Sequence, residues 1–531
     1  MKRKIYICTV VCGLLLVVAT RVAQLQSKSN ADPQFAVGIV FHDKNGNKKY
    51  EKGEPVLPNV RVSNGRDIVK TDQHGRYKLA VNDDTIVFIV KPRGWRTVLS
   101  DTRLPRFYYI HKPNGSPKLK YPGVKPTGPL PSSVDFPLYP QREPEQFKAI
   151  LFGDPQPRNQ KEVDYIAHDV VEELVGTDAS FGVTLGDVVF DRLDLFESQA
   201  RTIALLGIPW YNVIGNHDIN LDASSDQTSD ETFERAFGPA YYSFDYGKVH
   251  FLVIDNIEWY VEDAKTKDGK KKRGYRGGLG QRQLEFIRND LALIPAKQMV
   301  VILMHIPLTG VNDRHDLYRM IEKRPFCISV SGHTHHHEHR YITRKDGWRG
   351  PQPHHHIINV TVSGSWWKGA PDERKIPHAT MADGAPNGYS ILSFDGTDYR
   401  LDFKAAGRSA EYQMNIHAPE LVSQKELAKT TVTVNVFNGS EKSKVSMRIG
   451  KNSKWLTMKH SPGIDPLYRQ VFEAEKKLKK KPWLSMSGPK TSPHLWKANL
   501  PPLPAGTHLI EIRAIDENDR SVSGKRIIRI K

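Results

Sequence analysis

The chain has 531 residues, too many for one ordinary domain, and its 39% hydrophobic and 9% aromatic residues exclude a largely disordered protein. Its formal net charge of +18 is compatible with three kinds of anionic partner: nucleic acid, anionic membrane surfaces and phosphate-bearing substrates. The densest basic runs, Lys267 to Arg273 and Lys476 to Lys481, contain no aromatic residues, so we interpret them as solvated loops and expect no specific nucleic-acid binding.

The N-terminus has the pattern of a targeting segment. Lys2, Arg3 and Lys4 precede an apolar run from Ile5 to Ala19 that contains no charge. This run is shorter than the roughly 20 residues that a membrane-spanning helix needs. We therefore expect residues 1–26 to be a signal peptide and the protein to be periplasmic or secreted. The alternative is an uncleaved anchor that holds the protein on a membrane, facing outward.

Residues 35–140 alternate short β-rich runs with Asn, Asp and Gly turns, which predicts an N-terminal β-sandwich. One of its turns, DKNGNKKYEKGE, has oxygen-bearing side chains at positions that calcium loops use: Asp43, Asn45, Asn47, Glu51 and Glu54. Lys48 stands where such loops have glycine, so an Asn/Gly-rich turn is the alternative to a calcium site. A Pro-rich connector follows, from Tyr121 to Gln146.

From residue 147 to 405, apolar strands alternate with amphipathic helices, the pattern of a layered α/β domain. A helix is predicted from Lys161 to Leu174 and another from Gln281 to Leu293. The predicted strands are FKAILFGDPQP, FGVTLGDVVFD, IPWYNVIGNHD, VHFLVIDN, MVVILMHIPL and FCISVSGHTHHH. Several of them end directly in Asp, Asn, Gln or His, at the sheet edge where α/β proteins assemble their sites.

These polar endings form an ordered set. Two divalent ions a few ångströms apart need about seven or eight O and N ligands, including a carboxylate that can bridge them. The sequence offers GDPQ with Asp154 and Gln156, GDVVFD with Asp187, GNHD with Asn216 and His217, LMHIPL with His305, and GHTH with His333 and His335.

Taken together, the five blocks resemble the calcineurin-like metallophosphoesterase signature D-x-[HQ], GD-x-x, GNH[DE], H and GH-x-H. The resemblance implies a four-layer αββα core with two metal ions, of Mn, Fe or Zn. It assigns Asp154, Gln156, Asp187 and His335 to one ion, and Asp187, Asn216, His305 and His333 to the other. Asp187 bridges the ions in this scheme. Gln156 stands where many members have histidine, which leaves the identity of the first metal open.

The resemblance also implies the catalytic roles. Paired cations supply hydroxide at neutral pH and neutralise charge on the phosphoryl oxygens. His217, next to a ligand but not one itself, is expected to protonate the leaving group, with Asp218 orienting its ring. The alternative is that His217 only donates a hydrogen bond to phosphate. Asp191 and Arg192 belong either to the surroundings of the site or to a surface turn.

The histidines that crowd the end of the signature, His336, His337, His339 and His354 to His356, raise the option of a third metal site. Downstream, the stretch from Val362 to Tyr399 is similar to a subgroup of the superfamily that has additional N- and C-terminal β-domains. Four of its loop residues are candidates for substrate binding: Trp366, Trp367, Asn387 and Tyr389. The alternative is that the tryptophans cover the sheet and PNGY is a turn.

Residues 411–531 return to β texture and predict a C-terminal β-sandwich. The expected activity is metal-dependent hydrolysis of a phosphorylated small molecule or a cell-envelope phosphate, with phosphomonoesters slightly preferred. A phosphodiesterase for nucleotides or lipid headgroups is the alternative. A cell-surface binding protein with an inert phosphatase domain is a further one.

Overall fold

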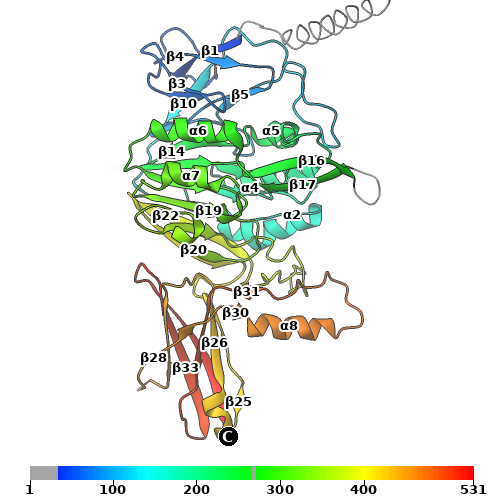
Figure 1. Ribbon diagram of the computed structural model, residues 1–531, viewed down its shortest axis with the longest axis vertical. Coiled ribbons are helices and arrows are strands. Elements are labelled where there is room, and N and C mark those ends of the chain that lie inside the picture. Colours follow the sequence, from blue (N-terminus) through cyan, green and yellow to red (C-terminus); the bar gives the residue numbers. More distant parts are fainter. Residues whose placement is uncertain (1–33, 266–270, 452) are drawn as a thin grey trace, which may run out of the picture.

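The computed structural model describes residues 34–265, 271–451 and 453–531, so the predicted targeting segment, residues 1–26, lies outside the described residues. Figure 1 shows three stacked parts: an N-terminal β-rich part, a central part of sheets and helices, and a C-terminal β-rich part. Within the described ranges, no helix combines the length and the apolar character needed to cross a bilayer.

Two mixed sheets form the centre. The first has the order β13 (Trp210–Val213), β12 (Phe181–Leu185), β11 (Gln146–Phe152), β22 (Gly388–Asp395) and β23 (Asp398–Ala405). The second has the order β14 (Tyr242–Tyr246), β15 (Val249–Val253), β18 (Met299–Leu303), β19 (Cys327–Ser331), β21 (His354–Ile358) and β20 (Glu338–Ile342). Strands β11, β12 and β13 are parallel, as are β15, β18, β19 and β21. Every strand predicted for this region is therefore present.

Helices cover the outer faces of both sheets. On the first sheet lie α4 (Phe196–Ala204) and one continuous helix made of α2 (Gln160–Ile166), a π-helical segment (Ala167–Val171) and α3 (Glu172–Leu174). On the second lie α6 (Gly280–Ala292) and α7 (Arg314–Ile321), while α5 (Glu231–Phe237) packs in a separate apolar cluster. The expected αββα fold class is confirmed. The short 3-10 helices are Leu193–Leu195, Asp226–Thr228, Leu308–Gly310, Arg344–Asp346 and Gln424–Lys429.

A β-hairpin that the sequence analysis missed projects from the second half of the core. It pairs β16 (Ile257–Lys265) with β17 (Lys271–Gly277), and Figure 1 shows it extending to one side of the molecule. The basic run interpreted as a solvated loop therefore belongs partly to a strand, because Lys271, Lys272 and Arg273 lie in β17.

The N-terminal part consists of two four-stranded sheets. One has the order β4 (Arg76–Val81), β1 (Gln34–His42), β10 (Phe136–Pro140) and β6 (Trp95–Arg96); the other has β3 (Ile68–Lys70), β2 (Arg61–Ser63), β5 (Thr85–Ile89) and β9 (Tyr108–His111). A short pair, β7 (Val98–Leu99) and β8 (Pro105–Arg106), completes it.

This part shares its hydrophobic core with the centre. Phe88 of β5 packs against Phe286 of α6, with ring centroids 5.7 Å apart, and both side chains are fully buried. Arg61, also buried, places its guanidinium 2.6 Å from an Asp245 oxygen and 3.0 Å from an Asp290 oxygen. His250 bridges the same two carboxylates at 2.8 Å each. A buried ion network thus joins β2 to β14, β15 and α6.

The C-terminal part has its own core. One of its sheets has the order β24 (Met414–His417), β26 (Thr431–Val436), β32 (Leu495–Asn499) and β29 (Lys459–His460). Another has the order β25 (Leu421–Val422), β34 (Ser521–Ile530), β33 (Gly506–Ile515), β27 (Lys444–Ile449) and β28 (Leu456–Thr457). The sequence analysis missed a helix here, α8 (Pro466–Lys476), which follows β30 (Gly463–Ile464) and precedes β31 (Thr491–Ser492). Asp465 caps its first turn by accepting a hydrogen bond from the Tyr468 N–H.

Candidate metal centre and active site

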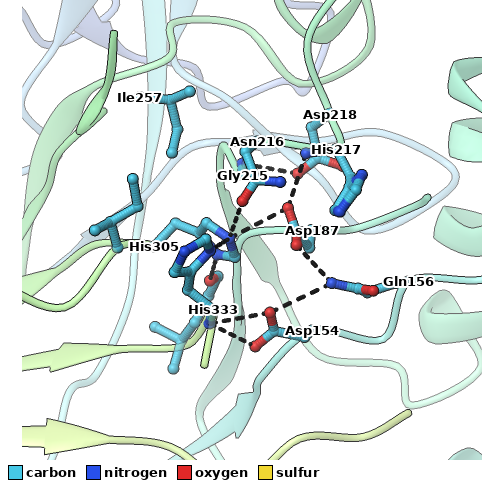
Figure 2. Close-up of polar contacts among 12 residues, drawn as sticks. Asp154, Gln156, Asp187, Gly215, Asn216, His217, Asp218, Ile257, His305 and His333 are labelled. Carbon is cyan, nitrogen blue, oxygen red and sulfur yellow. Dashed lines mark hydrogen bonds and ion pairs between the residues drawn. The ribbon is translucent and has the colours of Figure 1, made fainter. Parts of the chain in front are cut away.

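The expected ligands lie just beyond the carboxyl ends of five parallel strands. Asp154 and Gln156 follow β11, Asp187 follows β12, Asn216 follows β13, His305 follows β18, and His333 and His335 follow β19. Because these strands come from both central sheets, the two sheets meet at this edge. Figure 2 shows the polar side chains turned toward one another there.

His305 is the centre of one group of atoms that could coordinate a metal ion, called donor atoms below. Its Nδ1 donates to the Leu185 carbonyl at 2.8 Å, so Nε2 faces the interior of the site. Within 3.1–3.2 Å of this Nε2 lie three further donor atoms: Asn216 Oδ1, Asp187 Oδ1 and His333 Nδ1. Burial lowers the pKa of His305, but the Asp187 carboxylate outweighs burial and raises it to about 9. The surroundings of Nε2 therefore favour a positive charge.

A second group surrounds Asp154. Gln156 Nε2 lies 2.5 Å from Asp187 Oδ2 and 3.5 Å from Asp154 Oδ1, while its buried Oε1 has no hydrogen-bond partner. His335 donates from Nδ1 to the Gly364 carbonyl at 2.5 Å, and its Nε2 is 3.7 Å from Asp154 Oδ1. Burial lowers the pKa of His335 to about 3, which keeps the ring neutral and suited to ligation.

These donors fit metal ions. Two ligands about 2.1 Å from one ion lie about 3.0–3.4 Å apart, which matches the spacing around His305 Nε2. Among the described residues, the three-residue cluster of metal-type ligands is Asp187, His305 and His333, whose donor atoms all lie within 4.8 Å of one another. In the second group, turning over the Gln156 amide would point the orphaned Oε1 at two carboxylates, an arrangement that requires a cation.

Two glycines of the signature blocks are required because atoms of a metal ligand lie too close to them to leave room for a side chain. A Cβ on Gly215 would lie 2.0 Å from the Asp187 backbone nitrogen, and one on Gly332 would lie 2.4 Å from Asp154 Oδ2. Each ligand pair can meet only because the neighbouring residue has no side chain. This explains physically why a glycine directly precedes each of the ligands Asn216 and His333 in the sequence.

Several ligands have left-handed backbones. The φ angles are 41° at Asp154, 34° at Gln156, 51° at Asp187, 75° at His333 and 54° at His335. Side chains other than glycine rarely adopt this conformation, and such residues concentrate at functional sites. The sharp turn after each strand is what directs these side chains back over the sheet edge.

His217 lies beside the centre, as expected, but its partner differs from the expected one. Its Nδ1 is 2.8 Å from Asp191 Oδ1, its ring stacks on Phe190 with centroids 4.0 Å apart, and its backbone N–H donates to Asp187 Oδ1 at 2.9 Å. Burial lowers the pKa of His217, and the Asp191 hydrogen bond with the charge of Asp187 reverses this to a net increase.

The prediction that Asp218 orients this ring is wrong. The buried Asp218 carboxylate accepts three backbone N–H bonds instead, from Val188 and Val189 at 3.0 Å and from Gly215 at 2.8 Å. Asp218 therefore holds the two ligand loops together, and Asp191 is the residue that contacts the imidazole. Proximity in sequence misled the prediction, because Asp218 points back into the loop.

The four proposed substrate-binding residues separate into two groups. Trp366 stacks on the His335 ring, with centroids 4.1 Å apart, and lies at the rim of the site. The other three are packing residues: Trp367 is buried and donates to the Pro155 carbonyl, Tyr389 is buried under the helices of the first sheet, and Asn387 donates to Asp169 at 2.9 Å. These three residues therefore fit the alternative interpretation, in which the tryptophan covers the sheet and PNGY is a turn, better than a role in substrate binding.

The sequence analysis missed one residue at the rim. Tyr275 of β17 packs its ring edge-to-face with His333, at 6.1 Å between centroids, and remains 39% exposed. No local motif marks this tyrosine, because the hairpin that carries it was not predicted. Trp366 and Tyr275 thus contact the rings of the two GHTH histidines.

In the part of the chain that the structure describes, the histidines proposed for a third metal site form no cluster of metal-type ligands. His354 and His356 both hydrogen-bond Ser329, and His337 and His339 both hydrogen-bond Asn438. These histidines are structural contacts inside the sheet and at the border with the C-terminal part.

The DKNGNKKYEKGE turn is closed by its own hydrogen bonds. Asp43 accepts from the Gly46 and Lys48 N–H groups, and Asn45 and Asn47 donate their side-chain amides to Glu51. The Asn/Gly-rich turn accounts for every one of these contacts, and calcium binding stays a prediction.

Comparisons with known proteins agree with the signature. Residues 147–337 match the model for calcineurin-like phosphoesterase, residues 42–121 the model for its N-terminal part, and residues 356–521 the model for its C-terminal part. No curated protein matches the chain.

Among solved structures, a purple acid phosphatase, PPD1, from yellow lupin (Lupinus luteus) seeds is 14% identical, with a TM-score of 0.35 over 66% of this chain and 67% of that one. CopC from Methylosinus trichosporium OB3b is 16% identical, with a TM-score of 0.13 over 22% of this chain and 85% of that one. Both similarities are low, so the family rests on the three matched segments and the ligand geometry. The chain belongs to the calcineurin-like phosphoesterases that carry additional N- and C-terminal domains, and it is a metal-dependent phosphoester hydrolase.

Proposed function

We propose that this protein hydrolyses phosphomonoesters outside the cytoplasm, with His217 as the proton donor to the leaving group. The observation that carries the proposal is the position of His217. Its backbone binds the Asp187 carboxylate, and its ring is fixed between Asp191 and Phe190. With Nδ1 engaged by Asp191, Nε2 is the atom that can deliver a proton.

The chemistry divides between the ions and the chain. The donor set is suited to two ions of Mn, Fe or Zn, which when bound would supply hydroxide at neutral pH and neutralise phosphoryl charge. Asp187 holds its two oxygens toward the two donor groups. Asn216, His305 and His333 complete one group, and Asp154, Gln156 and His335 complete the other. His217 then carries the proton that the leaving oxygen requires.

Positive charge beside the centre favours the dianion of a phosphomonoester over the monoanion of a diester. Lys368 Nζ lies 4.7 Å from the centre of the Trp366 ring. Burial lowers the pKa of His333 to about 4, and the charges of His305, His217 and, last, Lys490 add to this decrease. A phosphodiesterase for nucleotides or lipid headgroups is the competing activity, because the same centre serves both reactions.

The test is a screen of phosphate mono- and diesters with the purified protein loaded in turn with Mn, Fe and Zn. A higher kcat/KM for monoesters supports the proposal, and a preference for diesters with every metal contradicts it. No turnover of any ester by protein that holds about two ions per chain would favour the inert binding protein.

The location outside the cytoplasm rests on the sequence of residues 1–26. Deleting this segment is expected to leave an active protein in the cytoplasm. Cell fractionation and sequencing of the mature N-terminus test this expectation. Full-length protein in the cytosol with its first residues intact would contradict it, and an intact N-terminus in the membrane fraction would support the anchored form.

A further inference from the structure

We infer that α8 and the segment after it form a docking surface for an anionic lipid bilayer. This α8 surface consists of four apolar residues, Leu467, Val471, Leu478 and Leu484, and four lysines, Lys476, Lys477, Lys479 and Lys480. The inference concerns binding, so it does not depend on which phosphoester the active site cleaves.

The apolar residues of the α8 surface are partly exposed to solvent, and two of them, Leu467 and Val471, also line a cleft together with Asp372 and Glu373 of the central part. Leu467 is 41% exposed, Val471 47%, Leu478 48% and Leu484 51%. The side chains that α8 buries are instead Tyr468 and Glu475. Leu467 and Val471 are four residues apart and therefore lie on the same face of the helix. Figure 1 places α8 beside the C-terminal sandwich, near β30 and β31.

The same segment is strongly basic. Five of the six residues from 476 to 481 are lysines, and Lys476, Lys477, Lys479 and Lys480 are exposed. Lys481 pairs with Glu475 at 3.0 Å and Lys476 approaches Glu473 at 3.8 Å. Within the described part of the chain, Lys477, Lys479 and Lys480 make no ion pair. Their charge is available to an external partner.

The exposed apolar side chains and the lysines together indicate which kind of partner the α8 surface binds. A lysine run that is merely solvated gives no reason for Leu478 and Leu484, which lie among and beside the lysines, to be about half exposed. A protein interface would bury those side chains, but the cores of such interfaces are depleted of lysine. A bilayer with anionic headgroups can bind both kinds of residue, because apolar side chains enter the headgroup boundary while lysines lie at the charged surface.

The α8 surface is connected to the rim of the active site. The Leu484 carbonyl accepts a 2.9 Å hydrogen bond from the Gly369 N–H, and the Lys490 N–H donates to the Ala382 carbonyl at 2.9 Å. Residues 366–369 lead from this contact directly to Trp366, which stacks on His335. A bilayer bound to the α8 surface would thus lie next to the part of the chain that leads to Trp366.

The test is hydrogen–deuterium exchange of the full chain with vesicles of phosphatidylglycerol and phosphatidylcholine, compared with pure phosphatidylcholine. Residues 466–484 are expected to exchange several-fold more slowly with the anionic vesicles only, and added salt should remove the effect because it screens the lysines. Because the readout is local, attachment through residues 1–26 does not mimic it.

Two matched pairs of variants make the test specific. Lys479→Glu/Lys480→Glu should abolish the protection, while Lys49→Glu/Lys52→Glu, the same charge change on exposed N-terminal lysines, should keep it. Leu478→Ser/Leu484→Ser should weaken it, while Leu205→Ser/Leu221→Ser, at leucines that are 66% and 42% exposed, should not. Unchanged exchange of residues 466–484 with anionic vesicles would overturn the inference. Concentration-dependent protection without vesicles would also overturn it and would assign the surface to a second copy of the chain.

Discussion

Asp191 accepts a 2.8 Å hydrogen bond from His217, although 26 residues separate them in the sequence. This contact and the Phe190 ring leave the imidazole a single orientation beside Asp187. Asp191 itself has a left-handed backbone, with φ of 56°, as several of the expected metal ligands do. The proposed proton donor is thus positioned by the same type of sharp turn that positions those ligands.

The first prediction concerns His217. His217→Ala should retain both metals but slow the hydrolysis of alkyl phosphates by about 10²–10⁴, the usual effect of losing a general acid. Aryl phosphates with acidic leaving groups should lose less, because their leaving oxygen does not need the proton. Steady-state kinetics with both substrate types and metal analysis test this. An equal loss for both types would show that His217 is not the donor.

Asp187→Asn tests the bridging carboxylate. Because Asp187 has one oxygen in each donor group, we expect this variant to lose most of its metal and its turnover. Metal analysis by mass spectrometry and kcat measurements provide the readout. Asp194→Asn is the control, since this carboxylate pairs with Arg192 at the surface. If Asp187→Asn kept two ions and normal activity, the proposed centre would be wrong.

Gln156 distinguishes the two donor groups. Gln156→Ala should reduce the metal content from about two ions toward one, because it removes a ligand from the Asp154 group only. Gln156→His should restore two ions, since imidazole is a stronger ligand for Mn, Fe or Zn. Gln160→Ala, on the exposed face of α2, controls for general effects. A full complement of metal in Gln156→Ala would exclude Gln156 as a ligand.

Arg61 should be critical for stability. Removing one member of a buried ion network costs roughly 3–5 kcal/mol, so Arg61→Ala should lower the free energy of unfolding by about this amount. Arg66→Ala removes an exposed pair with Asp67, 2.8 Å long, and should cost under about 1 kcal/mol. Chemical denaturation measures both. Equal effects of the two substitutions would argue against the buried network.

The same network predicts a pH dependence. Burial lowers the pKa of His250, but Asp290 and Asp245 outweigh it and raise the pKa from 6.5 to about 9. The folded state therefore binds this proton more tightly than the unfolded state. The stabilisation from His250 should be complete below pH 6.5 and disappear as the pH rises through about 9. The difference in unfolding free energy between the natural protein and His250→Gln should shrink over this range. A constant difference would refute the shift.

Much of the core could be predicted because its signals are local. Asp154, Asp187, Asn216, His305 and the GHTH histidines each follow an apolar strand, and parallel strands bring their ends to one edge. Asp191 could not be assigned, because its contact with His217 depends on how two loops cross. Tyr275 was missed because a charged, alternating hairpin resembles a loop, and Trp367 and Tyr389 were misassigned because burial is not visible in a loop motif.

The continuity between the N-terminal sandwich and the centre bears on how the chain is made. Arg61 leaves the ribosome long before its partners, since Asp245 and Asp290 follow it by 184 and 229 residues. Until those partners emerge, the N-terminal strands display an unpaired cation and an uncovered aromatic surface around Phe88. Synthesis therefore includes a long interval in which this part cannot complete its structure, whereas the C-terminal sandwich draws on its own core and can fold as soon as it is released.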